Sequence, residues 1–164
     1  QTCALPISEL YRTAYLMLRN QQDAEDAVQD TFVKLWRRKE SIRKPESLRF
    51  WLLRSLSDTA RDALRRRKRE VPEEEIQDFA EQRSDRENGD FTAEVLSSSE
   101  MEKLLSLLTP NARGVVVLYY FNELSVKEIA QLLGQPEGTV KSRLFHARQR
   151  LKQAFLEEGL CREK

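Results

Sequence analysis

Hydrogen-bond donors recur at helical spacing near the end of this 164-residue chain. They are Thr139, Ser142, Arg143, His146 and Arg150, and the opposite side of the same stretch carries Val140, Leu144, Ala147 and Leu151. This spacing predicts a helix with one polar and one apolar face. A helix packed on its apolar face, with donors in front and almost no acidic residue after Glu137, is typical of one that enters a DNA major groove.

A second helix and a tight turn are predicted just before this one. Ser125 and Glu128 form a capping box, so a helix is expected to begin at Val126. Gly134 can adopt the left-handed conformation that ends a helix, and Pro136 suits the first turn of the next. The first helix buries Val126, Ile129, Ala130 and Leu133. The pattern indicates a helix-turn-helix, although any amphipathic helical hairpin shares part of it.

No other group of residues indicates chemistry at a reactive centre. His146 is the single histidine, and neither Cys3 nor Cys161 stands at metal-ligand spacing from it. No Gly-rich phosphate loop occurs. We therefore expect no enzyme and no cofactor. The two cysteines fit a reducing cytoplasm, and neither a signal peptide nor an apolar run of about 18 residues is present.

The net charge of +1 hides strong segregation along the chain. Residues 54–69 contain seven basic and two acidic side chains, whereas residues 70–100 contain eleven acidic and two basic ones. Blocks of opposite sign predict an anionic partner for the first segment and a solvated linker for the second.

Helical signals dominate the remaining chain. Helices are expected over 8–18, 45–69, 100–108 and 111–121. Another is expected to begin at a cap on Asp23 and to run to about Arg38, and the second helix of the helix-turn-helix is expected to continue through Phe155. The linker includes a possible helical turn at 76–80. Residues 115–120 have strand-like propensity, but Thr109 and Pro110 are start signals that favour a helix there.

Several motifs together resemble a known family. Residues 128–130 (EIA), 133–134 (LG), 138–143 (GTVKSR), 147–148 (AR) and Leu151 resemble region 4 of sigma-70 factors, in the extracytoplasmic-function (group IV) form. Response-regulator output domains share part of this core. Residues 23–36 (DAEDAVQDTFVKLW) and 47–56 (SLRFWLLRSL), followed by a basic tail, are similar to region 2 of the same family. A βαβ receiver pattern is not seen, which favours the sigma family.

The resemblance implies an all-α fold of two small domains. Region 2 would be a three-helix bundle over 8–69, and region 4 a helix-turn-helix over 100–158, joined by a flexible acidic linker over 70–99. It also implies a sigma subunit that binds core RNA polymerase (β′ clamp helices and β flap) and promoter DNA, with an anti-sigma factor as regulator. A stand-alone helix-turn-helix transcription regulator is the alternative, and a truncated product that folds without initiating transcription is a third.

The resemblance assigns roles to three groups of residues. The −35 element would meet Pro136, Thr139, Lys141, Ser142, Arg143, His146 and Arg150. The −10 element would meet Arg54, Ser57, Asp58, Arg61 and Arg65. Polymerase would meet Asp23, Glu25, Asp26, Gln29 and Asp30, which could otherwise be a solvated helix face or a metal or acid–base cluster.

Two residues depart from the family pattern and affect the expected base preference. His146 stands where Arg is usual, and Asp58 stands where Asn is common. Phe50 and Trp51 are expected to pack in the core rather than to contact DNA. Residues 1–7 (QTCALPI) resemble a translated sequencing adapter, so we expect them to be an artefact and the true start of the protein to be missing.

Overall fold

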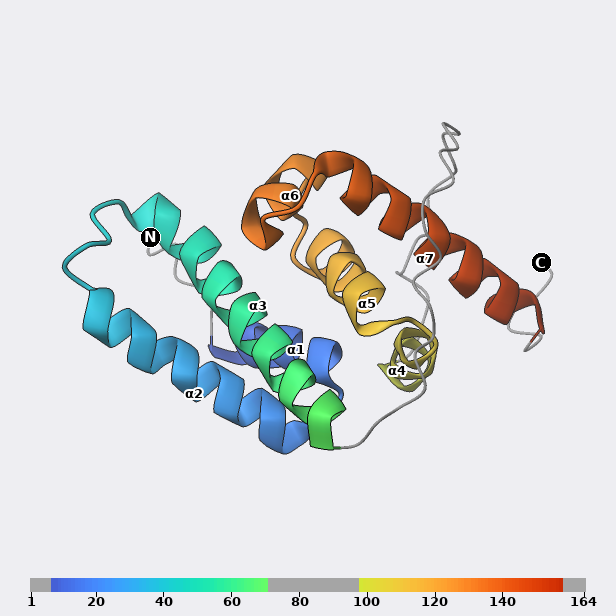
Figure 1. Ribbon diagram of the computed structural model, residues 1–164, viewed down its shortest axis with the longest axis horizontal. Coiled ribbons are helices and arrows are strands. Elements are labelled where there is room, and N and C mark those ends of the chain that lie inside the picture. Colours follow the sequence, from blue (N-terminus) through green and yellow to red (C-terminus); the bar gives the residue numbers. More distant parts are fainter. Residues whose placement is uncertain (1–6, 71–97, 158–164) are drawn as a thin grey trace.

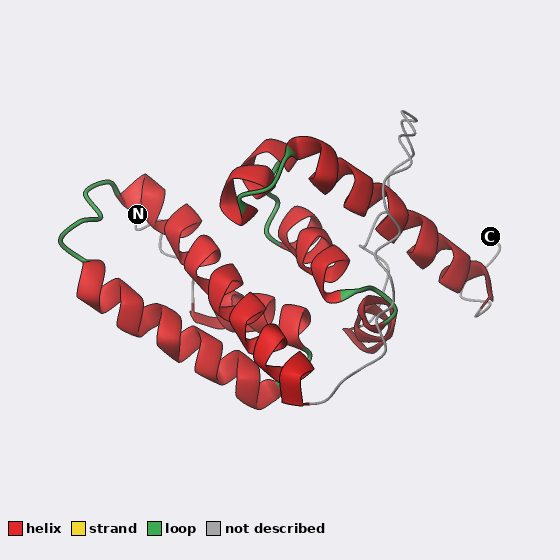
Figure 2. Cartoon of the chain, in the orientation of Figure 1, coloured by secondary structure: helices red, strands yellow, loops and turns green. Residues whose placement is uncertain are grey.

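The computed structural model describes residues 7–70 and 98–157, and within these it is entirely helical (Figure 1). Figure 2 shows only helices and short loops in the described part of the chain, which confirms the predicted all-α class. The predicted turn at 76–80 and most of the predicted linker lie outside the described residues, as do residues 1–6.

The N-terminal module (residues 7–70) is a bundle of three helices. They are α1 (Ile7–Leu18), α2 (Gln21–Arg38) and α3 (Pro45–Glu70), and each packs against the other two. The core of the bundle is aliphatic and includes Leu10, Leu18, Leu53 and Leu56. The cap of α2 differs from the prediction, because the side chain of Asn20, not Asp23, caps the helix by accepting from the Asp23 N–H. Phe50 and Trp51 are half-buried against the core, as predicted.

The C-terminal module (residues 98–157) contains four helices and a π-helical turn. They are α4 (Ser98–Ser106), α5 (Pro110–Val116), η2 (Val117–Phe121), α6 (Val126–Leu133) and α7 (Glu137–Glu157). Thr109 caps α5 and Pro110 is its first residue, as predicted. The expected helix over 111–121 is wrong in one respect: from Val117 it widens to i→i+5 hydrogen bonding, and the Asn122 N–H donates to the Val117 carbonyl.

The two modules contact each other directly along a boundary that we call the seam. The N-terminal side of the seam is formed by α1 and α3, and the C-terminal side by α5, η2 and α6. Four hydrogen bonds join these elements: Arg49 to the Asn122 carbonyl (2.7 Å), Arg61 to the Leu133 carbonyl (3.3 Å), Arg113 to the Met17 carbonyl (3.0 Å), and Asn122 Nδ2 to Thr13 Oγ1 (3.0 Å). A fifth hydrogen bond between the modules runs from the Tyr15 hydroxyl of α1 to Glu102 Oε2 of α4 (3.4 Å). The buried residues of both modules form one continuous apolar core.

Candidate nucleic-acid interface

The turn between α6 and α7 is built as the sequence predicted. The Ser125 hydroxyl accepts from the Glu128 N–H, and the Glu128 carboxylate accepts from the Ser125 N–H at 2.7 Å. These hydrogen bonds hold the pKa of Glu128 below its ordinary value. Gly134 ends α6 with a φ of 63°, a left-handed conformation that is strained in other residues because their Cβ atom crowds the backbone. Pro136 precedes α7, and its carbonyl accepts from Thr139 and Val140.

One face of α7 is buried and the other is open. Val140, Leu144, Ala147 and Leu151 are buried against the rest of the C-terminal module, which confirms the predicted apolar stripe. On the other side Pro136, Lys141, His146 and Arg150 are exposed, and Thr139 and Ser142 are half-buried. The open face therefore presents hydroxyls, cations and an imidazole, groups that can donate to phosphates and base edges.

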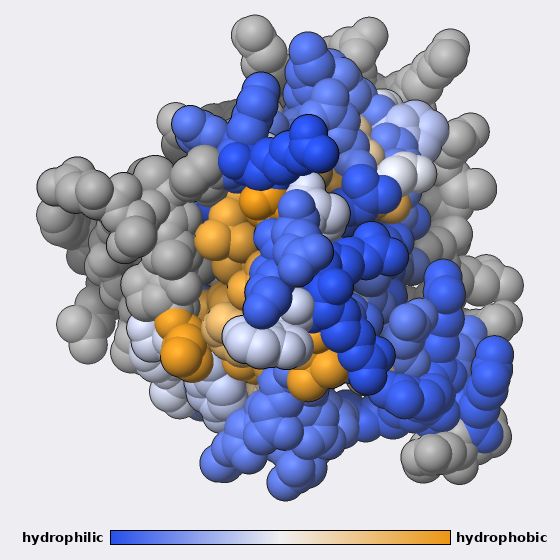
Figure 3. All heavy atoms as spheres, turned by 90° about the vertical axis from the view of Figure 1, so that its left-hand side faces the viewer, coloured by the Kyte–Doolittle hydropathy of each residue, from blue (hydrophilic) through white to orange (hydrophobic). Residues whose placement is uncertain are grey.

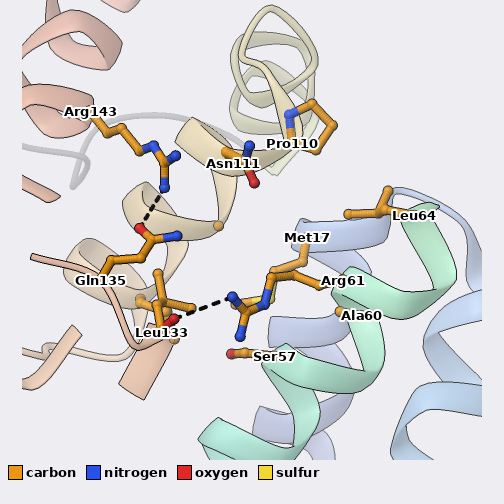
Figure 4. A pocket seen from close by; sticks show the side chains of 12 residues that line it. Met17, Ser57, Ala60, Arg61, Leu64, Pro110, Asn111, Leu133, Gln135 and Arg143 are labelled. Atoms are coloured by element: carbon orange, nitrogen blue, oxygen red, sulfur yellow. Dashed lines mark hydrogen bonds between the residues drawn. The ribbon is translucent and has the colours of Figure 1, made fainter. Parts of the chain in front are cut away.

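Two arginines of α7 are engaged within the protein. Arg143 donates to Gln135 Oε1 at 2.5 Å, and Figure 4 shows both side chains lining a cavity beside the seam. Arg148 donates to the Tyr120 hydroxyl at 2.8 Å and lies over the rings of Tyr119 and Tyr120. Arg143 was assigned to DNA contact in the sequence analysis, and the structure places it at the flank of the open face rather than at its centre.

The open face also contains residues that the sequence analysis omitted. Phe145 lies edge-on to the His146 ring, with centroids 5.4 Å apart, and Gln149 is exposed. Phe145 follows Ser142 by three residues, and Gln149 follows His146 by three. The helical period that identified the polar stripe therefore also contained these two positions.

The basic helix α3 presents a second stripe of candidate DNA contacts. Arg54, Asp58 and Arg65 are exposed, and Asp58 is paired with Arg61 at 2.5 Å. Ser57 is buried at the seam, and Arg61 is half-buried and hydrogen-bonded to the Leu133 carbonyl, as Figure 4 shows. Three of the five predicted −10 contacts are thus open, while Ser57 and Arg61 are turned toward the C-terminal module.

The acidic residues of α2 divide into two groups. Asp30 pairs with Lys34 at 2.8 Å and accepts from Thr59 of α3, while Asp23 pairs with Arg67 at 3.0 Å. The hydrogen bond from Lys34 is the main reason that the pKa of Asp30 lies below its ordinary value. The other three predicted polymerase contacts face outward: Asp26 and Gln29 are exposed, and Glu25 is half-buried and accepts from Gln21.

An apolar pair missed by the sequence analysis extends this outward face of α2. Val33 is 47% exposed and Trp36 is 71% exposed, and both lie at helical spacing from Gln29. The Lys39 ammonium sits 3.8 Å from the Trp36 ring centroid. Figure 3, which views the side where the α2–α3 connection lies, shows a largely hydrophilic surface with a smaller apolar area. A large exposed aromatic among polar residues is typical of a protein-binding site.

Comparison with known proteins assigns both modules to one family. The family described as "Sigma-70 region 2" matches residues 7–70, and "Sigma-70, region 4" matches residues 98–151. This chain is an extracytoplasmic-function sigma factor of the sigma-70 family. It is 34% identical over 145 residues to the sigma factor SigM of Mycobacterium tuberculosis H37Rv, covering 87% of this chain and 69% of that protein. It is 29% identical over 154 residues to SigV of Bacillus subtilis, covering 93% and 87%.

Solved sigma factors share the fold. The sigma factor RpoE, determined in complex with the anti-sigma factor NepR from Bartonella quintana, superposes with a TM-score of 0.68 at 27% identity, covering 90% of this chain and 89% of that one. CnrH, determined with the cytosolic domain of CnrY, has the same fold with a TM-score of 0.59.

This sigma factor therefore binds core RNA polymerase and directs promoter recognition and transcription initiation. Sigma factors are regulatory initiation factors rather than catalytic enzymes, and members of the family act in the cytoplasm with the polymerase. Within residues 7–70 and 98–157, no helix is long and apolar enough to cross a membrane, and no group of three or more potential ligands could hold a metal ion.

Proposed function

We propose that α7 of this sigma factor enters the major groove of the −35 element. Two features of α7 support this proposal. Its open face is rich in hydrogen-bond donors, and its opposite, buried face is held in place by α5 and α6. Lys141 and Arg150 would bind phosphates and supply most of the affinity. Thr139, Ser142 and His146 would face base edges, and Phe145 could contact a thymine methyl group.

The helix α3 would bind the −10 element as it melts. Unstacking a base costs a few kcal/mol, a cost offset when cations and stacking surfaces receive the freed strand. Arg54 and Arg65 are exposed cations on one side of α3, and Asp58 lies between them. A carboxylate at Asp58 offers acceptors only, so it would favour bases that present a donor. Ser57 and Arg61 would join this surface only after they leave the seam.

The outward face of α2 would dock on core polymerase. Asp26 and Gln29 supply the polar part of this face, and Val33 and Trp36 supply the apolar centre that a stable protein contact needs. We assign Asp23 and Asp30 to holding α2 on α3 instead, because Asp23 pairs with Arg67 of α3 and Asp30 accepts a hydrogen bond from Thr59 of α3. We expect α2 to dock on the β′ clamp helices of core polymerase, in the cytoplasm. We expect an anti-sigma factor to regulate this sigma factor.

In vitro transcription over a promoter library tests the function directly. The purified chain is mixed with core polymerase, and transcripts are sequenced to find start sites. We expect start sites that share −10 and −35 sequences and that disappear when the chain is omitted. A chain that binds promoter DNA but neither binds core polymerase nor supports initiation would instead be a stand-alone regulator.

A further inference from the structure

Two arginines hold α7 from opposite sides of its buried stripe. Arg148 follows Arg143 by five residues, which is about 140° around the axis at about 100° per residue, and the buried Leu144 lies within that arc. Arg143 donates to Gln135 in the turn before α7, as Figure 4 shows. Arg148 donates to the Tyr120 hydroxyl of η2 at 2.8 Å. Each flank of α7 is therefore tied to a different part of the C-terminal module.

Two tyrosine rings surround the guanidinium of Arg148. Its Cζ lies 5.4 Å from the ring centroid of Tyr119 and 5.8 Å from that of Tyr120, both within the range of a cation–π interaction. The rings meet edge-on, with centroids 4.9 Å apart and planes at 76°. A turn closed by i→i+5 bonds holds more residues than an α-helical turn, so consecutive side chains diverge less around its axis. The wide turn η2 thus lets two consecutive tyrosines face one cation.

The apolar stripe of α7 cannot by itself set the rotation of the helix about its axis. Hydrophobic burial has no preferred direction, whereas hydrogen bonds weaken steeply when their geometry is lost. An α-helix with its side chains has a radius of about 5–6 Å, so a rotation of about 20° moves a side chain on the open face by about 2 Å. A hydrogen bond to a base edge needs a separation of about 2.7–3.2 Å, and such a movement would break it.

We propose that Arg148 is a positioning residue for −35 recognition, because its contact with Tyr120 fixes the rotation of α7. The side chains whose aim it sets are those that face base edges, namely Thr139, Ser142 and His146. The proposal rests on the proposed function, since it assumes that α7 reads the −35 element. Arg148 is half-buried and directed at the tyrosines of η2, so it acts through the helix and not on a base.

A phosphate contact is the alternative role for Arg148. Arg148 follows Lys141 by seven residues, which places the two side chains within about 20° of each other around α7. Lys141 is exposed, however, whereas Arg148 is half-buried and hydrogen-bonded within the protein. To meet a phosphate, the guanidinium would have to leave the Tyr120 hydroxyl and both rings. The structure therefore favours the positioning role.

Three variants and a matched control separate the two roles. Tyr120→Phe removes the hydroxyl that accepts from Arg148 and keeps the ring, and Arg148→Met removes the guanidinium and keeps an unbranched side chain. The third variant carries both substitutions. Tyr11→Phe, the control, makes the same change at a half-buried tyrosine of α1 that stacks on Tyr15 in the N-terminal module. Urea denaturation of each free chain checks that it folds.

The measured quantity is discrimination of the −35 element by the complete holoenzyme. Each chain is combined with core polymerase, and its affinity is measured for a promoter duplex and for the same duplex with the −35 element replaced. We expect the ratio of the two affinities to fall about fivefold for Arg148→Met, the lower end of what one base contact contributes. Tyr120→Phe should lower the ratio less, because the rings still hold the cation. The double variant should match Arg148→Met, since both changes remove one contact.

The salt dependence of the same affinities distinguishes positioning from phosphate binding. Arg148→Met should keep the wild-type salt slope on both duplexes, because the exposed cations of α7 are unchanged. Tyr11→Phe should keep both the ratio and the slope. A slope shallower by about 0.9 on both duplexes, with an unchanged ratio, would assign Arg148 to a phosphate and overturn the proposal.

The remaining outcomes are equally decisive. Lower urea midpoints with a wild-type ratio in Arg148→Met and Tyr120→Phe would show a structural role only and would overturn the proposal. If Arg148→Met does not fold, Tyr120→Phe, which loses a single hydroxyl, still decides the question. A wild-type holoenzyme that binds the two duplexes equally would overturn the proposed role of α7 at the −35 element instead.

Discussion

Replacing Lys141 with alanine removes one of the exposed cations of α7, and the effect can be calculated. The helix has five Lys and Arg residues, but Arg143 and Arg148 are half-buried and hydrogen-bonded within the protein. This leaves Lys141, Arg150 and Lys152 exposed for phosphate contact. Each contact contributes a slope of about −0.9 to a plot of log affinity against log salt concentration, so three contacts predict about −2.7 and two about −1.8.

The predicted difference is large enough for fluorescence anisotropy with a labelled duplex. Between 50 and 200 mM salt, affinity should fall about 40-fold for the wild type and about 12-fold for Lys141→Ala. The loss should be similar on promoter and unrelated duplexes, because phosphates do not report sequence. Lys103→Ala, at an exposed position of α4, serves as the control and should keep the wild-type slope. A wild-type slope in Lys141→Ala would refute the placement of Lys141 at a phosphate.

Three further outcomes are expected. Ser125→Ala should lower the free energy of unfolding by about 1 kcal/mol, because it breaks the capping box of α6, and urea denaturation measures this loss. Asp30→Asn should make stability less sensitive to acid. The pKa of Asp30 is lower in the folded chain than in the unfolded chain, where it is near 3.8, so the ionised carboxylate stabilises the fold. This contribution is fully present above the unfolded pKa and is lost as the pH falls through the lower folded pKa. Urea midpoints measured at several pH values would show this loss. Trp36→Ala should weaken core polymerase binding by at least about tenfold in a surface-binding assay, since aromatic anchors that become buried dominate interfaces. Leu107→Ala, at an exposed leucine just after α4, should not weaken it.

The helix-turn-helix was predictable because its signals are local. The capping box, the left-handed glycine and the apolar stripe of α7 each depend on residues within one or two turns. The cap at Asn20 was also a local signal, but Asp23 was chosen in its place although both residue types cap helices well. Periodicity located the polar side of α7, yet it could not show that Gln135 and Tyr120 sequester two of its arginines.

The contact between the modules could not be predicted from the sequence. Arg113 and Met17 are 96 residues apart, and Asn122 and Thr13 are 109 residues apart. No periodicity or capping signal links positions so distant, and each of these residues also suits an ordinary helix. The contacts across the seam were therefore not predicted, and Ser57 and Arg61 were predicted only as contacts to the −10 element.

The wide turn η2 makes the number of residues in this segment as important as their chemistry. Its five residues, Val117–Phe121, fit one more residue into the turn than a regular α-helix would hold. Inserting a further residue would exceed what this turn holds and would rotate every later position by about 100° around the helix axis. Asn122 would then swing away from Thr13. Variants of this protein should therefore tolerate exchanges of one apolar residue for another between 117 and 121 far better than single-residue insertions.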